Sequence, residues 1–184
     1  QGIDTVVTRN VTNFTPTADF RWKISKVSQL RFNYRGSTSQ PSISDLLEIK
    51  DDSDPLNVST GNAGLKPSFT NSFRLFYNNA WTTYQRVMYA NLQFNTTSNS
   101  IANMVTYNPE TGGRYSRPEN INGNWRISGN VMFNTAIDSM ARFNVNTSTG
   151  VSYVNSVGYV NLNRGAVASK SNTKNLTISE QLAT

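Results

Sequence analysis

The feature that most constrains the fold of this chain is an alternation of large apolar and polar side chains with a period of two residues. Between Ala18 and Ser25, for example, Phe20 and Trp22 alternate with polar residues. The same alternation recurs in six more segments, which are Leu30–Arg35, Phe69–Asn78, Tyr84–Asn95, Asn124–Phe133, Ala141–Asn146 and Lys174–Leu182. Successive side chains of a β-strand point to opposite faces, so the sequence predicts seven strands, each with an apolar and a polar face.

The connections between these segments alternate in length. Short turns are predicted at Lys26–Ser28, Asn79–Thr82 and Asn134–Ser139, and long loops at Gln40–Pro67, Asn103–Glu119 and Gly150–Ser171. Strands of about 9–11 residues cross a bilayer when tilted, and short turns at one rim with long loops at the other are typical of an outer-membrane barrel. The sequence therefore predicts an all-β, antiparallel up-and-down meander, with residues 1–184 forming a single section of a transmembrane β-barrel.

Composition argues against catalytic chemistry. The chain has no cysteine and no histidine, which removes thiol nucleophiles, disulfides, histidine acid–base catalysis and most zinc sites. Three acids, Asp51, Asp52 and Asp54, are close together beside Pro55, but no nucleophile or base accompanies them and turn capping explains them well. We expect no enzymatic activity, no catalytic residues, no metal and no cofactor.

The two predicted faces differ in chemistry. The apolar face is rich in aromatic residues, several of them near strand ends, where membrane-interface girdles are found. The polar face carries seven basic residues that become candidate lumen-facing groups: Arg21, Lys23, Arg31, Arg35, Arg74, Arg126 and Arg142. The simpler alternative is an ordinary antiparallel sheet with one face on a core. Mid-strand charges favour a wet lumen, because burying an unpaired charge costs several kcal/mol.

The order of several short sequence words resembles the β-barrel of TonB-dependent, SusC-like receptors of Gram-negative bacteria. The words are Phe14–Phe20, Leu30–Gly36, Gln40–Ile43, Asp52–Asn57, Gly61–Pro67, Tyr107–Gly113 and Arg117–Gly123. In the word Gly-Asn-Pro-x-Leu-Lys-Pro-Glu, this chain has Ala63 in place of the proline and Ser68 in place of the glutamate. In that family the word shapes an extracellular loop.

The resemblance implies a barrel of about 22 strands around a plug, located in the cell outer membrane. It implies nutrient transport with energy supplied by TonB through the parent chain, and it makes this chain an internal section of a longer protein. The partners implied are outer-membrane lipid, the rest of the parent barrel with its plug, TonB, and an oligosaccharide or other nutrient. Trp81 and Tyr107 are candidate ligand-stacking residues, although loop packing or a girdle position would also explain them.

Two other classes of protein are alternatives to a membrane barrel. A soluble β-sandwich or small-barrel surface module, of carbohydrate-binding or adhesin type, would also alternate in this way. Nucleic-acid binding is disfavoured because the basic and aromatic residues fall on opposite faces.

An isolated barrel section would expose its edges and its aromatic face, so we expect it to curl into a small closed barrel or sandwich. The exposure of Trp22, Phe73 and Trp125 tests this expectation.

Overall fold

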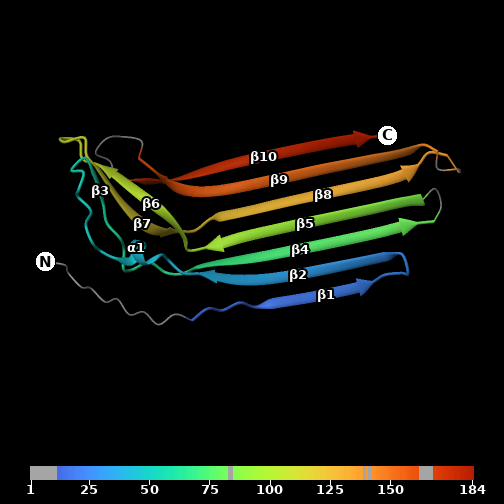
Figure 1. The fold of residues 1–184 in the computed structure, drawn as a ribbon, viewed down its shortest axis with the longest axis horizontal. Helices are drawn as coiled ribbons and strands as arrows, with labels where there is room; N and C mark the ends of the chain where they lie inside the picture. Colours follow the sequence, from blue (N-terminus) through green and yellow to red (C-terminus); the bar gives the residue numbers. More distant parts are fainter. Residues whose placement is uncertain (1–11, 83–84, 139, 141, 162–167) are drawn as a thin grey trace.

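One large antiparallel sheet dominates the computed structural model, which describes residues 12–82, 85–138, 140, 142–161 and 168–184 (Figure 1). Its seven strands are β1 (Thr17–Lys23), β2 (Ser28–Ser39), β4 (Ser68–Trp81), β5 (Arg86–Ser98), β8 (Asn124–Ala136), β9 (Asn144–Val160) and β10 (Ser169–Ala183). They lie side by side in chain order. The predicted all-β, up-and-down meander is therefore confirmed.

Strand register sorts the side chains into an apolar and a polar face. Phe73 of β4 is paired with Tyr34 on one side and Phe94 on the other, whereas its neighbour Arg74 is paired with Asn33 and Gln93. Directly paired residues of antiparallel strands project to the same face, so the alternation of each strand continues across the sheet. Tyr84, expected at the start of β5, lies outside the described residues.

Among the described residues, no second layer of structure covers this sheet. Ala136 is the only buried hydrophobic residue that the described part of the sheet contains. Of the three test residues, Trp22 is 54% exposed, whereas Phe73 and Trp125 are half-buried. The sheet is open, with β1 and β10 at its edges. The expected curling into a small barrel or sandwich is therefore wrong, and so is the soluble sandwich, which requires two packed sheets. In the described residues, no helix has the length and apolar character needed to cross a membrane.

The long connections gather at one end of the sheet and the short turns at the other. At the long-connection end, hereafter the loop end, lie α1 (Ile43–Leu46), β3 (Asn57–Ser59), β6 (Ser100–Tyr107) and β7 (Arg114–Ile121). The three strands form a second sheet in the order β3-β7-β6. The predicted loop at Asn103–Glu119 is thus a β-hairpin, since the turn cluster at Asn108–Gly113 connects two paired strands.

The predicted long loop at Gly150–Ser171 is wrong. Strand β9 continues to Val160 and β10 begins at Ser169, with fifteen register pairs between them. Much of β9 consists of Ser, Thr, Asn, Gly and Val, with Tyr153 and Tyr159 as its only large side chains, so the alternation of large apolar and polar residues is weak. Pairing with two neighbouring strands, rather than hydropathy, maintains this strand.

The loop end has a core of its own, centred on two docked segments. Leu65 and Ile121, both 1% exposed, are the largest fully buried side chains that the structure describes. Asn62 is also buried, and its amide nitrogen donates to the carbonyl of Pro118 at 3.0 Å while its amide oxygen accepts from Arg117 at 3.0 Å. These bonds join the 40–67 connection to the β6–β7 hairpin, and we call the joined structure the loop unit.

A second asparagine completes the loop unit. Asn120 accepts from the backbone N–H of Lys66 at 2.8 Å and donates to the Lys66 carbonyl at 3.0 Å. Gly61 lets the segment before Leu65 lie directly against the backbone of Leu47, because a Cβ at position 61 would lie 2.1 Å from the carbonyl oxygen of Leu47. The words Gly61–Pro67 and Arg117–Gly123 are thus two halves of one docked structure.

Replacing Asn62 should loosen the loop unit without disturbing the large sheet. In Asn62→Ala, the Pro118 carbonyl loses a buried hydrogen bond and the Arg117 guanidinium loses a part-buried one, at a cost of about 1–3 kcal/mol. Hydrogen exchange of β6 and β7 amides should accelerate on the order of tenfold, whereas exchange in β4 and β5 stays unchanged. Asn103→Ala is the matched control, because Asn103 is exposed on the same hairpin. Equal exchange in both variants would contradict the docking role of Asn62.

Candidate functional site

The apolar face of the sheet carries a row of aromatic rings that crosses five strands near the loop end. Ring centroids are 4.9 Å apart for Tyr34 and Phe73, 6.0 Å for Phe73 and Phe94, 6.2 Å for Phe94 and Trp125, and 5.2 Å for Trp125 and Tyr153. We call these five residues the loop-end aromatic row. Aromatic side chains arranged in this way form the girdle at a membrane–water interface.

A second aromatic cluster lies at the short-turn end of the same face. Trp81, the last residue of β4, contacts Phe133 edge-to-face with ring centroids 6.5 Å apart, and it is 42% exposed. On β4, Trp81 lies eight residues from Phe73, which is about 26 Å along a strand. With strands tilted by about 35–45°, this corresponds to a height of about 20 Å, slightly less than the apolar band of about 25 Å that lies between the two girdles of such barrels.

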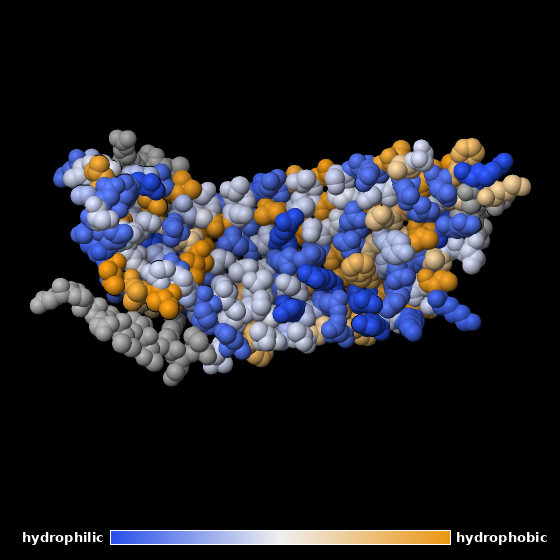
Figure 2. All heavy atoms as spheres, viewed as in Figure 1, coloured by the Kyte–Doolittle hydropathy of each residue, from blue (hydrophilic) through white to orange (hydrophobic). Residues whose placement is uncertain are grey.

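The polar face holds six of the seven basic residues predicted for it. They are Arg21 and Lys23 on β1, Arg31 and Arg35 on β2, Arg74 on β4 and Arg126 on β8, and all are exposed. Hydrophilic residues predominate over the middle of the strands in the view of Figure 2. Register pairs Arg21 directly with Arg31, a repulsive arrangement in the absence of water or an anionic partner.

Little on the protein itself balances this charge. The only acidic side chain that the described strands place on the polar face is Asp19, which accepts a hydrogen bond from Asn33. None of the six bases forms an ion pair with a described residue. The polar face is therefore a positively charged surface.

Arg142 does not belong to this surface, which corrects its prediction as a strand residue. The strand predicted at Ala141–Asn146 begins only at Asn144, so Arg142 lies in the preceding turn. Its guanidinium donates to the carboxylate of Asp138 at 2.8 Å, and its backbone N–H donates to the same carboxylate at 2.7 Å. The hydrogen bonds from Arg142 and the nearby backbone amides hold the pKa of Asp138 below its usual value.

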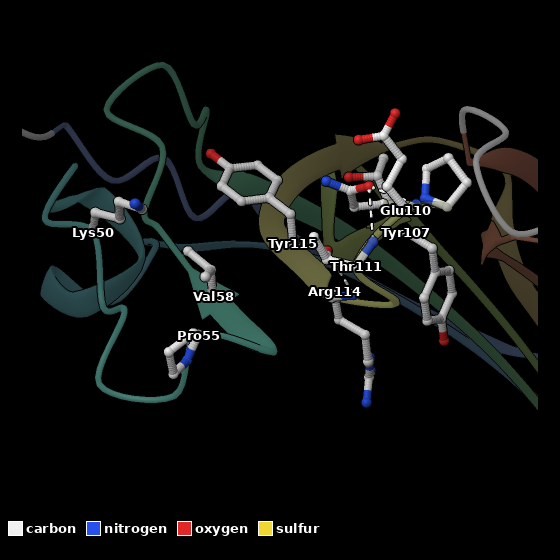
Figure 3. A pocket seen from close by; sticks show the side chains of 12 residues that line it. Lys50, Pro55, Val58, Tyr107, Glu110, Thr111, Arg114 and Tyr115 are labelled. Atoms are coloured by element: carbon white, nitrogen blue, oxygen red, sulfur yellow. Dashed lines mark hydrogen bonds between the residues drawn. The ribbon is translucent and has the colours of Figure 1, made fainter.

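A pocket of about 630 Å³ opens in the loop unit and includes the predicted residue Tyr107. Figure 3 shows Lys50, Pro55 and Val58 on one side of it, and Tyr115, Arg114 and Tyr107 on the other. The guanidinium carbon of Arg114 lies 6.0 Å from the centre of the Tyr107 ring, at the outer limit of a cation–π contact. Glu110 adds a carboxylate at the turn of the hairpin.

The chemistry of this pocket suits a hydroxyl-rich or anionic ligand. It offers a ring for stacking, the exposed base Arg114, and Lys50, which is paired with Asp52 at 3.3 Å. Sequence reasoning identified Tyr107 but missed Arg114. The strong turn at Asn108–Gly113 was the available signal, because a hairpin closed by that turn pairs Tyr107 with Arg114 directly. Trp81 lies at the opposite end of the sheet and does not share a ligand site with Tyr107.

The acidic loop residues serve the local backbone. The carboxylate of Asp51 accepts from the hydroxyl and backbone N–H of Ser53, and that of Asp54 accepts from Asn57 and the backbone of Leu56. These hydrogen bonds, those from the Ser53 and Asn57 side chains first, lower the pKa of both carboxyls. Across the described residues, no three Asp or Glu side chains converge in a way that could hold a metal ion.

Comparison with known families gives the context for this geometry. Residues 2–183 match the model of a family described as the outer membrane protein beta-barrel family. The chain belongs to this family. No curated protein and no solved structure matched the chain significantly. Membership places the chain in the cell outer membrane as barrel wall, with membrane lipid against the barrel's apolar face.

In this outer-membrane barrel section, the turn at Asp138 should become less ordered in acid. A depressed pKa means that the order contributed by the carboxylate is complete above the ordinary aspartate value, about 3.9, and is lost as pH falls through the lower folded value. Amide exchange protection at Arg142 and Phe143 should therefore drop between about pH 5 and pH 2. In Asp138→Asn the protection should not change over that range. A pH-independent wild type would refute the assignment.

Proposed function

We propose that this chain forms wall and extracellular loops of a TonB-dependent, SusC-like nutrient-uptake receptor, and that it has no chemistry of its own. The observation that carries the proposal is the polar face, with six bases and one acid. In a complete barrel this face lines the lumen, so Arg21, Lys23, Arg31, Arg35, Arg74 and Arg126 face inward.

An unpaired basic surface favours a lumen that contains an acidic partner. Large outer-membrane transporters of about 22 strands hold a plug in the lumen, and carboxylates on a plug would pair with these bases. Water would screen the repulsion between Arg21 and Arg31, whereas carboxylates on a plug would also neutralise the two charges. A plug with surface carboxylates would therefore both pair with the bases and remove the repulsion between them. In a receptor of this type, the plug couples to TonB through the parent chain.

The loop unit supports a role in collecting the nutrient. It has a packed core and a network of asparagine hydrogen bonds, so it presents its pocket on a rigid support. Tyr107 and Arg114 provide a stacking surface and a positive charge, a combination that suits an oligosaccharide, including an acidic one. The loop carboxylates are engaged in turns, which supports a binding role rather than a catalytic one.

Crosslinking from the polar face tests the proposal. In the whole protein that contains this chain, a photoreactive residue replacing Ser72 or Ser128 should crosslink to a plug segment of the same polypeptide, because both positions lie beside polar-face bases. Replacement of Leu75, on the apolar face of β4, is the matched control and should give lipid adducts.

Peptide mapping of the crosslinked products distinguishes the outcomes. A plug adduct from Ser72 or Ser128, together with loss of nutrient uptake when TonB is depleted, would support the receptor. Polar-face positions that give no intramolecular adduct, in a protein whose uptake does not require TonB, would contradict it.

A further inference from the structure

Two lysines stand on the apolar face of β10, at its loop end. Register pairs Lys170 with Tyr159 and Lys174 with Asn155. Lys170 and Lys174 therefore share a face with Leu176 and Ile178, which are 58% and 66% exposed. Basic residues on the lipid-contacting side of a barrel are costly in the hydrocarbon region and are tolerated near its interface.

The loop-end aromatic row gives a reference for the height of these lysines relative to the membrane interface. Leu176 is paired with Tyr153, a member of the row. Lys174 is two residues farther toward the loops, about 7 Å, and Lys170 is six residues farther, about 20 Å. Both ammonium groups thus lie outside the apolar band, at the level of lipid headgroups and beyond.

No carboxylate that the described strands place on the same face neutralises the pair. The acidic residue that β9 and β10 contribute to this face is Glu180, which accepts a hydrogen bond from Thr149 at 2.6 Å. Glu180 is six residues from Lys174 in the opposite direction, about 20 Å away. Between the lysines stands the neutral Asn172, so the local field is positive.

A groove of about 310 Å³ lies in the apolar face below the lysines. Gly129 leaves space between Leu92 and Val151, and the groove extends to Leu75 and Val131. Gly129 is paired with Val151, and Val151 with Ile178, so the groove lies four residues, about 13 Å, below the level of Lys174. Its lining is almost entirely apolar.

We propose that this wall carries a binding site for a phosphate-bearing glycolipid of the lipid A type, in the outer leaflet. Lys174 and Lys170 bind the headgroup phosphates, and an acyl chain occupies the groove at Gly129. The argument for this occupant is charge complementarity above the aromatic row combined with an apolar groove below it. Long loops mark the outward side, so the headgroups at this level belong to the outer leaflet. The site depends on the barrel wall alone and not on nutrient uptake or TonB.

Binding of lipid A tests the site in the whole protein that contains this chain, purified in mild detergent. Native mass spectrometry would count bound lipid A, with dephosphorylated lipid A as the parallel probe. Lys170→Gln/Lys174→Gln should lower the affinity for lipid A on the order of tenfold. Lys26→Gln/Lys66→Gln is the matched control, because it removes two exposed lysines that lie in connections outside β10 and should leave binding unchanged.

A second variant fills the groove without altering charge. A Cβ at position 129 would lie 3.4 Å from Leu92 Cδ1 and 3.5 Å from the Asn91 carbonyl, so Gly129→Val is sterically acceptable. It should weaken both lipid probes, whereas the lysine substitutions should weaken only the phosphorylated one. A wild type that binds both probes equally, or equal losses in the two lysine pairs, would overturn the proposal.

Discussion

In a bilayer, every backbone N–H and C=O of a membrane-spanning strand must be paired, because hydrocarbon offers no hydrogen-bonding partner. A sheet meets this requirement through continuous ladders between neighbouring strands, and the seven-stranded meander of this chain does so from β1 to β10. The ladders use only the plane of the sheet, so both faces remain free for side chains. Each face then adopts the chemistry of its own surroundings: lipid on one side and, we propose, a wet lumen on the other.

The exposed apolar side chains and the separate core of the loop unit both follow from a sheet that has no core. Because no other described element covers the membrane-spanning part of its faces, large side chains such as Trp22 and Ile178 are exposed that would be buried in a soluble protein. The loops cannot be held by a core beneath them, so they have one of their own, built on Leu65, Ile121 and the Asn62 hydrogen bonds. Because the loop unit is stabilised independently of the sheet, one wall can carry a charged face, an apolar groove and a ligand-accessible loop pocket.

The sequence was most informative where side-chain size and polarity alternate strongly. Trp125–Phe133 of β8 is an example, since one face is large and apolar at nearly every position. It was least informative in β9, where most residues are small and only Tyr153 and Tyr159 mark the apolar face, so pairing with β8 and β10 defines the strand. Arg142 was misplaced because β9 starts at Asn144, three residues later than the predicted Ala141, which leaves Arg142 in a turn. The docking of Asn62 on Pro118 joins positions 56 residues apart, and no local pattern predicts it.

Accessibility along β8 tests most directly whether its faces meet lipid and water. This chain contains no cysteine, so spin labels can be attached to single cysteines from Arg126 to Phe133 in the reconstituted whole protein. Collisions with oxygen should peak at Ile127, Gly129, Val131 and Phe133. Collisions with a water-soluble nickel complex should peak at Arg126, Ser128, Asn130 and Met132. Two profiles that peak at the same residues, or that lack a period of two, would contradict the account of a wall between lipid and water.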